Sequence, residues 1–346
     1  MKIAVVTNMA PFVYGGAEFL AEGLAKKLKE YGHESQVIRL PFSWGSASQI
    51  AESMMAVKLT QVVNTDKVIA LKFPAYYIDH PNKSVWLLHQ FRQAYDLAGT
   101  EYDFFTEEHE YQKLRGAIKK TDNACFSKLK GRIFTISPVV TDRLMKYNNI
   151  PSEVLYHPLM ESAHFYNDGI GDYIFCPSRV NHSKRQHLAV EAMRYVKSGV
   201  KLMLAGKGDS QEDESRIFEL IEKNDLKNKV TYINRFISEK EKADLFAKCL
   251  AGIYIPFDED SYGYVTLEGF YSQKPMISCT DSGGTYVVVK NNITGYMTQS
   301  APEALAAAMD KMYENKSKAA EMGMNGFKLI EELGITWDNV IRRLLK

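Results

Sequence analysis

The sequence lacks the features that mark several broad classes of protein. Its net charge is only +1 over 346 residues, so it has no general positive field that would attract nucleic acid. It contains no run of about 18 apolar residues, the length that a membrane-spanning helix requires. The apolar stretch 3–7 is shorter than the core of a secretory signal peptide. We therefore expect a cytoplasmic protein with no nucleic-acid partner, whose membrane contact would be peripheral.

Cysteine is sparse and scattered. The four cysteines include no Cys-x-x-Cys pair. Cys176, Cys249 and Cys279 lie in apolar stretches, which predicts reduced thiols buried in a core. Such thiols are typical of cytosolic proteins and not of secreted scaffolds that depend on disulfides.

Two familiar nucleotide-binding motifs are also missing. No Gly-x-Gly-x-x-Gly fingerprint occurs, and no Gly-x-x-x-x-Gly-Lys-Ser/Thr loop occurs. These absences disfavour an ordinary dehydrogenase and a phosphate-loop NTPase.

What the sequence does contain is one plan repeated twice: an apolar strand, a glycine or basic turn, and a helix. The chain length favours two domains, and residues 159–170 form the best linker candidate. The plan predicts an α/β protein made of two doubly wound halves, whose strand ends face a common cleft. We expect buried strands at 3–7, 35–40, 67–71, 84–89, 131–137, 172–179, 201–205, 229–234, 251–256 and 274–280.

Two acidic residues, Asp260 and Glu268, lie on either side of a strand-to-helix turn that contains Gly263. The apolar run 251–256 precedes the turn, and helical spacing of apolar residues begins at Val265. In an open α/β sheet such a turn lies at the carboxyl end of the strands, where ligands bind. The carboxylates are either helix caps or acceptors for sugar hydroxyls, and this stretch alone leaves both readings open.

Glycine, basic and histidine residues follow other expected strands. Gly15 and Gly16 open a helix, so their amides either approach a phosphate or form a common turn. Arg179 and Lys184 precede another helix and form either a diphosphate clamp or a solvated loop. His89 ends an apolar strand and is either a structural residue or a catalyst.

The stretch 113–132 is strongly basic and contains a single acid, Asp122. Such a run is either a solvated face or a surface that docks on an anionic membrane. Its basic residues are Lys113, Arg115, Lys119, Lys120, Lys128, Lys130 and Arg132.

Together these residues resemble the retaining nucleotide-sugar glycosyltransferases of the GT-B fold, specifically glycosyltransferase family 4. The likeness spans nearly the whole chain and is strongest over 173–297. The family's first acid is a glutamate, whereas this chain has Asp260, which is shorter by one carbon–carbon bond of about 1.5 Å. The matching motifs are Gly15-Gly16-Ala17-Glu18, Arg179 with Lys184, Gly206-Lys207-Gly208, Asp260 with Glu268, and Gly283-Gly284.

The resemblance implies two Rossmann-like domains that face each other across a cleft. Residues 1–165 would bind the acceptor and residues 166–335 would bind the donor. The terminal helix, 336–346 with Trp337, would pack back on the first domain.

The resemblance also implies a role for each motif. Glu268 would accept the ribose hydroxyls. Arg179 and Lys184 would neutralise the diphosphate leaving group. The expected catalytic residues are these two together with His89 and Asp260. Asp260 and His89 would flank the anomeric carbon. Backbone groups would help to hold the donor at Gly15, Gly16, Gly206, Gly283 and Gly284.

The expected function is retaining transfer of a hexose from a nucleotide-diphosphate sugar to a glycan or lipid-linked acceptor, in cell-surface polysaccharide synthesis at the inner face of the membrane. No cofactor or metal is expected, and the acidic stretch 258–260 is the nearest approach to an Asp-x-Asp metal motif. Two alternatives stay open: another GT-B enzyme such as a sugar-nucleotide epimerase, and a non-catalytic subunit that binds a nucleotide sugar. The departure at Asp260 keeps the second alternative open.

Overall fold

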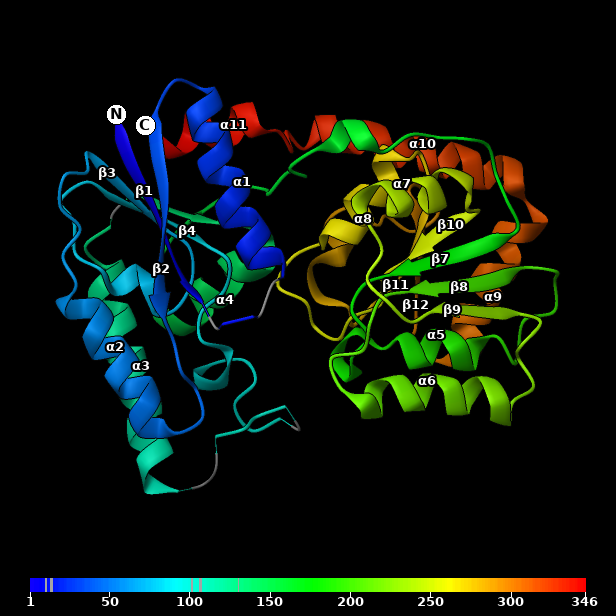
Figure 1. The fold of residues 1–346 in the computed structure, drawn as a ribbon, viewed down its shortest axis with the longest axis horizontal. Coiled ribbons are helices and arrows are strands. Elements are labelled where there is room, and N and C mark those ends of the chain that lie inside the picture. The colour runs from blue at the N-terminus through cyan, green and yellow to red at the C-terminus, as the bar shows by residue number, and fades with distance from the viewer. Residues whose placement is uncertain (10, 13–14, 101, 106–107, 130) are drawn as a thin grey trace. The chain divides into compact units, whose positions relative to one another are not determined.

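The apolar runs of the sequence form two parallel sheets, each in its own unit (Figure 1). The computed structural model describes residues 1–346 except 10, 13–14, 101, 106–107 and 130. Unit 1 consists of Met1–Met160 together with Thr336–Lys346, and unit 2 is Glu161–Ile335. The sequence had placed this boundary between residues 165 and 166.

Unit 1 contains a six-stranded sheet in the order β2-β1-β3-β4-β5-β6, and all neighbouring strands run parallel. The strands are β1 (Lys2–Met9), β2 (Glu34–Pro41), β3 (Lys67–Ala70), β4 (Lys83–Leu87), β5 (Ile133–Thr135) and β6 (Glu153–Val154). The helices are α1 (Gly16–Glu30), α2 (Ala47–Leu59), α3 (His109–Phe126), α4 (Pro138–Asn148) and α11 (Trp337–Leu344), with short turns η1 (Ala75–Tyr77) and η2 (Arg92–Ala94).

Unit 2 repeats the architecture, with strand order β12-β11-β10-β7-β8-β9 and parallel pairing throughout. Its strands are β7 (Tyr173–Pro177), β8 (Lys201–Ala205), β9 (Val230–Ile233), β10 (Ala251–Ile253), β11 (Met276–Cys279) and β12 (Gly295–Thr298). Its helices are α5 (Gln186–Ala192), α6 (Gln211–Lys223), α7 (Glu239–Lys248), α8 (Tyr264–Tyr271), α9 (Pro302–Glu314) and α10 (Lys316–Glu332), with short turns η3 (Ser162–His164), η4 (His182–Lys184) and η5 (Gly283–Val287).

The prediction of two doubly wound α/β halves is confirmed. Helices cover both faces of each sheet, so the strands are nearly continuous apolar runs and not alternating ones. Val5 and Val6 in β1, and Ile174 and Phe175 in β7, are completely buried. In each sheet the strand order reverses, at β1/β3 in unit 1 and at β7/β10 in unit 2. Such reversals open a crevice at the carboxyl ends of the strands.

The last helix, α11, returns to unit 1. The Trp337 indole N–H donates to the Leu159 carbonyl oxygen at 2.7 Å, and its ring meets Trp86 edge to face with centroids 6.4 Å apart. Val340 and Leu344 on the same helix are completely buried. The helix is therefore part of the core of unit 1.

None of the helices within the described ranges is both long enough and apolar enough to cross a membrane.

Candidate functional site

The acidic loop and the glycine turn, which are separated in the sequence, are joined in the structure. The Asp258 N–H donates to the Asp281 carbonyl oxygen at 2.9 Å, and the Gly284 N–H donates to the Glu259 carbonyl oxygen at 2.8 Å. Gly283 has φ +61°, and a Cβ there would lie 2.1 Å from the Glu259 carbonyl oxygen. Only glycine fits this contact, because any side chain would push the two loops apart.

Glu268 lies on α8 with one carboxylate oxygen engaged and the other unused. Its Oε1 pairs with Lys242 of α7 at 2.6 Å, and burial raises the pKa of Glu268 although Lys242 opposes the shift. Its Oε2 is buried and has no hydrogen-bond partner in the described part of the chain. A buried acceptor without a donor is costly, so this oxygen is ready to accept a ligand hydroxyl.

Asp260, the other acid of the motif, is 7% exposed, close to the 5% of Glu268. Both acids are therefore buried beside the turn and not displayed on the surface. Sequence reasoning missed Lys242, because no local motif ties a lysine on α7 to an acid 26 residues later.

Lys184 is paired within its own unit. Its Nζ contacts the Glu259 carboxylate and donates to the Tyr254 hydroxyl at 2.8 Å. Burial lowers the pKa of Lys184, but the negative charge of Glu259 and the hydrogen bonds to Glu259 and Tyr254 outweigh burial, so the pKa is raised and the side chain stays charged. An anion that binds Lys184 must compete with Glu259.

Arg179 follows β7 and is the more exposed member of the predicted clamp. Its guanidinium donates to Asp209 at 2.9 Å, and its side chain is 42% exposed. Beneath it the ends of β7 and β8 approach closely, because a Cβ on Gly206 would lie 1.9 Å from the Ser178 carbonyl oxygen. Gly206 thus serves the packing of the two strand ends that carry this turn.

Arg185 braces the whole edge, a role that the sequence did not reveal. Its guanidinium makes two 2.7 Å bonds to the Asp281 carboxylate. It also donates to the carbonyl oxygens of Ile255 at 2.8 Å and Pro256 at 2.9 Å. The side chain therefore fixes the turns after β7, β10 and β11 in one arrangement, and its hydrogen bonds lower the pKa of Asp281.

The predicted residues of unit 1 lie on turns that follow β1 and β4. Gly15 caps α1, and its N–H donates to Glu18 at 2.9 Å, while Lys72 pairs with Glu18 at 3.0 Å. A phosphate at Gly15 would compete with Glu18 for this amide.

His89 follows β4, and its Nδ1 faces the Gln90 carbonyl oxygen at 2.6 Å. Because a carbonyl oxygen only accepts, Nδ1 carries the proton. In the neutral ring this leaves the lone pair on Nε2.

The predicted site residues therefore fall into two groups. At the carboxyl edge of the unit 2 sheet, the structure places Arg179, Lys184, Gly206, Asp260, Glu268, Gly283 and Gly284. Gly15, Gly16 and His89 lie at the carboxyl edge of the unit 1 sheet. Among the described residues, no group of three or more His, Cys, Asp or Glu side chains is arranged to hold a metal ion.

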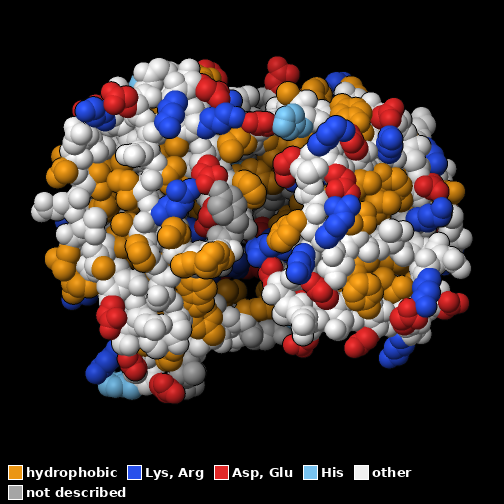
Figure 2. All heavy atoms as spheres, viewed as in Figure 1, with side chains coloured by type: hydrophobic (Ala, Val, Ile, Leu, Met, Phe, Trp, Pro, Cys, Tyr) orange, Lys and Arg blue, Asp and Glu red, His pale blue; other side chains and the backbone are white. Residues whose placement is uncertain are grey.

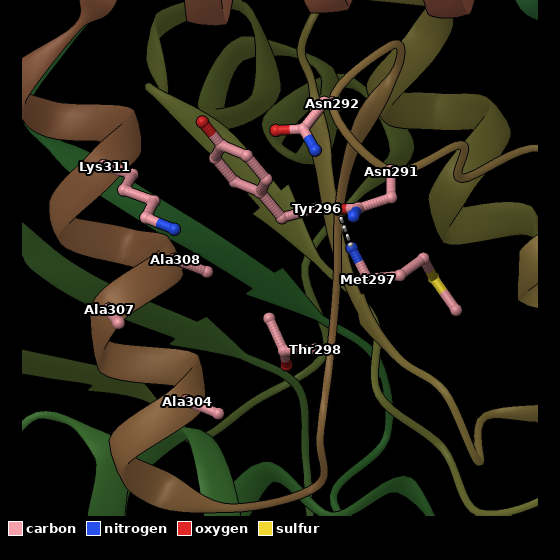
Figure 3. Close-up of a pocket in the computed structure, with 9 residues that line it drawn as sticks. All are labelled: Asn291, Asn292, Tyr296, Met297, Thr298, Ala304, Ala307, Ala308 and Lys311. Carbon is pink, nitrogen blue, oxygen red and sulfur yellow. Dashed lines mark hydrogen bonds between the residues drawn. The ribbon is translucent and has the colours of Figure 1, made fainter.

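A cavity of about 160 Å³ lies at the outer edge of the unit 2 sheet, between β12 and α9 (Figure 3). None of the predicted site residues lines it. Within it, the Asn291 side chain accepts a hydrogen bond from the Met297 N–H at 3.2 Å. Asn291 thus caps a backbone donor of an edge strand, which protects the strand from pairing with another chain.

Comparison with known proteins shows which proteins unit 2 resembles. Residues 168–329 match the family model described as glycosyl transferases group 1. The chain is 28% identical over 168 residues to human alpha-1,3/1,6-mannosyltransferase ALG2, covering 45% of this chain and 40% of that protein. It is 24% identical over 189 residues to the O-antigen chain mannosyltransferase C of Escherichia coli, covering 54% of this chain and 48% of that protein. The chain thus spans less than half the length of these curated relatives.

Solved structures match the fold of the whole chain. Sucrose-phosphate synthase from Thermosynechococcus elongatus has a TM-score of 0.74 at 15% identity, covering 99% of this chain and 96% of that one. HepE from Anabaena, in complex with UDP-glucose, has a TM-score of 0.71 at 16% identity, with 99% of both chains covered. Two Rossmann-like units of this kind constitute the GT-B fold.

The contact at Gly283 predicts the effect of one added methyl group. In Gly283→Ala the Cβ meets the Glu259 carbonyl oxygen, so we expect a loss of about 3 kcal/mol of unfolding free energy. The control is Gly169→Ala, which has a similar positive φ of +86° and no atom within 4 Å of the added Cβ; it should lose only about 1 kcal/mol, the cost of the left-handed backbone. Chemical denaturation of both variants tests this expectation, and equal losses would contradict it.

Proposed function

We propose that the protein transfers a sugar from a nucleotide-diphosphate sugar to a glycan or lipid-linked acceptor. Residues 168–329 match the model of the glycosyl transferases group 1, and the chain has the GT-B fold. The observation that carries the proposal is Glu268, a buried carboxylate with an unused oxygen beside a glycine turn and a basic turn. Support also comes from the two mannosyltransferases that the chain resembles and from the UDP-glucose complex of HepE, whose fold it shares.

In this proposal unit 2 binds the donor. The unused Oε2 of Glu268 accepts a ribose hydroxyl, which satisfies a buried acceptor. Lys184 and Arg179 take the diphosphate, and backbone groups of Gly283 and Gly284 help to hold it. The diphosphate displaces Glu259 from Lys184, so the negative charge of the diphosphate replaces that of the Glu259 carboxylate.

Sugar transfer requires that the departing diphosphate be stabilised as the bond to the anomeric carbon breaks. Positioned cations supply this stabilisation more strongly in a partly buried site than in water. We propose that Arg179 and Lys184 do so, and that Asp260 and His89 flank the anomeric carbon, with the lone pair of His89 Nε2 facing the sugar. Retention of anomeric configuration and a hexose as the transferred sugar are further parts of the proposal, supported by the resemblance to family 4.

The acceptor is proposed to be a cell-surface glycan or glycolipid. The resemblance to an O-antigen chain mannosyltransferase supports a polysaccharide acceptor, and the resemblance to ALG2 supports a mannosyl donor. A non-catalytic subunit that binds a nucleotide sugar is the second candidate, since Asp260 stands where the family has glutamate. Binding without turnover would identify that second candidate.

Substitution at Arg179 tests the donor site. Arg179→Ala removes a cation from the leaving group, so we expect kcat/KM for the nucleotide sugar to fall about 10- to 100-fold. Arg194→Ala is the control, since Arg194 is also an exposed arginine of unit 2 and should leave the rate unchanged. The assay measures release of nucleoside diphosphate from a panel of nucleotide sugars, with cell extract as acceptor. The enzyme proposal fails if the wild-type protein turns over none of them.

We also propose that the reaction proceeds without a metal ion. Glu259 is the central acid of the stretch 258–260, and its carboxylate pairs with Lys184, so cationic side chains can neutralise the diphosphate without a metal. Activity should therefore be unchanged in excess chelator. Loss of activity that magnesium or manganese restores would show instead that these acids hold a metal.

A peripheral contact with an anionic membrane is proposed for α2 and α3 of unit 1. In α2, Met55 is 59% exposed and Leu59 is 73% exposed, and Figure 2 shows hydrophobic side chains over this helix. From the basic stretch, Lys113, Lys120 and Lys128 are exposed. Apolar side chains beside lysines are the combination that an anionic bilayer surface attracts.

Other members of the basic stretch are less available for this contact. Arg115 pairs with Asp103 at 2.8 Å, Lys119 lies over the Tyr95 ring at 5.6 Å, and Lys130 lies outside the described residues.

Flotation with vesicles that contain anionic lipid tests the membrane proposal. Replacing Lys113, Lys120 and Lys128 by glutamine should abolish flotation, because each lysine contributes about 1 kcal/mol near such a surface. The matched control replaces Lys223, Lys227 and Lys318, three exposed lysines of unit 2, and should float like the wild type. If both triple variants float equally, α3 is not the docking surface.

A further inference from the structure

The interior of unit 1 holds a carboxylate to which the proposed sugar transfer assigns no role. Asp122 of α3 is completely buried, and three tyrosine hydroxyls donate to it. Tyr77 and Tyr76 donate to Oδ1 at 2.6 and 3.1 Å, and Tyr95 donates to Oδ2 at 2.6 Å. Burial raises the pKa of Asp122 to about 6, although the tyrosine hydrogen bonds oppose the shift.

This network costs more than an apolar core of the same shape, since a buried carboxylate must be stripped of water. Fully satisfied polar networks compensate by specifying a single arrangement of the groups that they join. The residues that this network joins therefore indicate which part of unit 1 it fixes.

The network continues from Asp122 toward His89. The Asn148 amide, at the end of α4, donates to the Tyr95 hydroxyl at 3.2 Å. The Gln90 amide donates in turn to the Asn148 side-chain oxygen, and Gln90 is 4% exposed. Every donor points the same way, from Gln90 through Asn148 and Tyr95 to the carboxylate, so each bond polarises the next.

Gln90 is the neighbour of His89 in the chain, and its carbonyl oxygen accepts the His89 Nδ1 proton at 2.6 Å. The same segment is tied to α4 a second time, because Asp96 pairs with Arg92 at 2.6 Å and with Arg143 at 3.4 Å. The segment 89–96 is therefore fixed by polar contacts with both α3 and α4.

We propose that Asp122, Tyr95 and Asn148 are positioning residues that fix the segment 89–96 and thereby the ring of His89. This proposal rests on the proposed function, in which the position of the His89 ring affects the rate of sugar transfer. Without the Tyr95 hydroxyl, the Asn148 amide keeps its bond to the Asn123 side-chain oxygen at 2.6 Å but loses the bond that links it to Asp122 through Tyr95. Its hold on Gln90 is therefore loosened.

The chain offers a matched pair of variants for the test. Tyr95 and Tyr77 both donate to Asp122 at 2.6 Å and are 4% and 5% exposed, but only the Tyr95 hydroxyl also accepts from Asn148. We expect Tyr95→Phe to lower kcat about tenfold with the donor KM unchanged, because a small misplacement of a catalytic group has effects of this size. Tyr77→Phe should keep kcat within about twofold of the wild type, because the chain that leads to Gln90 stays intact.

Hydrogen–deuterium exchange of the peptide that covers residues 89–97 gives a readout that does not depend on activity. Exchange there should be about tenfold faster in Tyr95→Phe than in Tyr77→Phe, because only the former removes a hydrogen bond from the chain that leads to Gln90. Equal exchange and equal kcat in the two variants would overturn the positioning role. If the wild type transfers no sugar, the proposed function fails, while the exchange comparison still decides whether this network fixes the segment.

Discussion

The bidentate pair between Arg185 and Asp281 is the interaction on which the arrangement of the carboxyl edge of the unit 2 sheet depends. It joins the turn after β7 to the turn after β11, and the same guanidinium holds the carbonyl oxygens that follow β10. The close contact of Gly283 with Glu259 requires that these turns stay in register. Hydrogen bonds to a charged partner are among the stronger ones in proteins, which suits a brace between three otherwise separate loops.

Cationic side chains at this edge are paired with acidic side chains of the same unit. Lys184 pairs with Glu259, Arg179 with Asp209, and Lys242 with Glu268. Under the proposed function, a diphosphate that binds here exchanges one anionic partner of Lys184 for another. Under the proposed function, discrimination between donors depends on how well each replaces these internal acids, and not on net attraction alone.

Much of the fold could be predicted from the sequence, because parallel strands covered on both faces are continuous apolar runs. The motifs around Asp260, Glu268 and Gly283 were also found, since each follows such a strand. The strand β12 was missed, because its four residues (Gly295–Thr298) are short and mixed in character. The role of Arg185 was also missed, because its partner Asp281 lies 96 residues away in the chain. The contacts of Lys242 and Asp122 were not predicted for the same reason. Tertiary packing determines their partners, and no local sequence pattern indicates it.

The return of α11 to the core of unit 1 has a consequence for how the two units can be exchanged. The chain leaves unit 1 after Met160 and comes back at Thr336, so unit 2 is topologically an insertion between two parts of unit 1. Removing the last eleven residues, 336–346, would strip Trp337 from the core of unit 1. A chimera that replaces unit 2 by the corresponding unit of another protein is therefore best built as a cassette with two junctions. A fusion at a single crossover would leave unit 1 with a foreign closing helix.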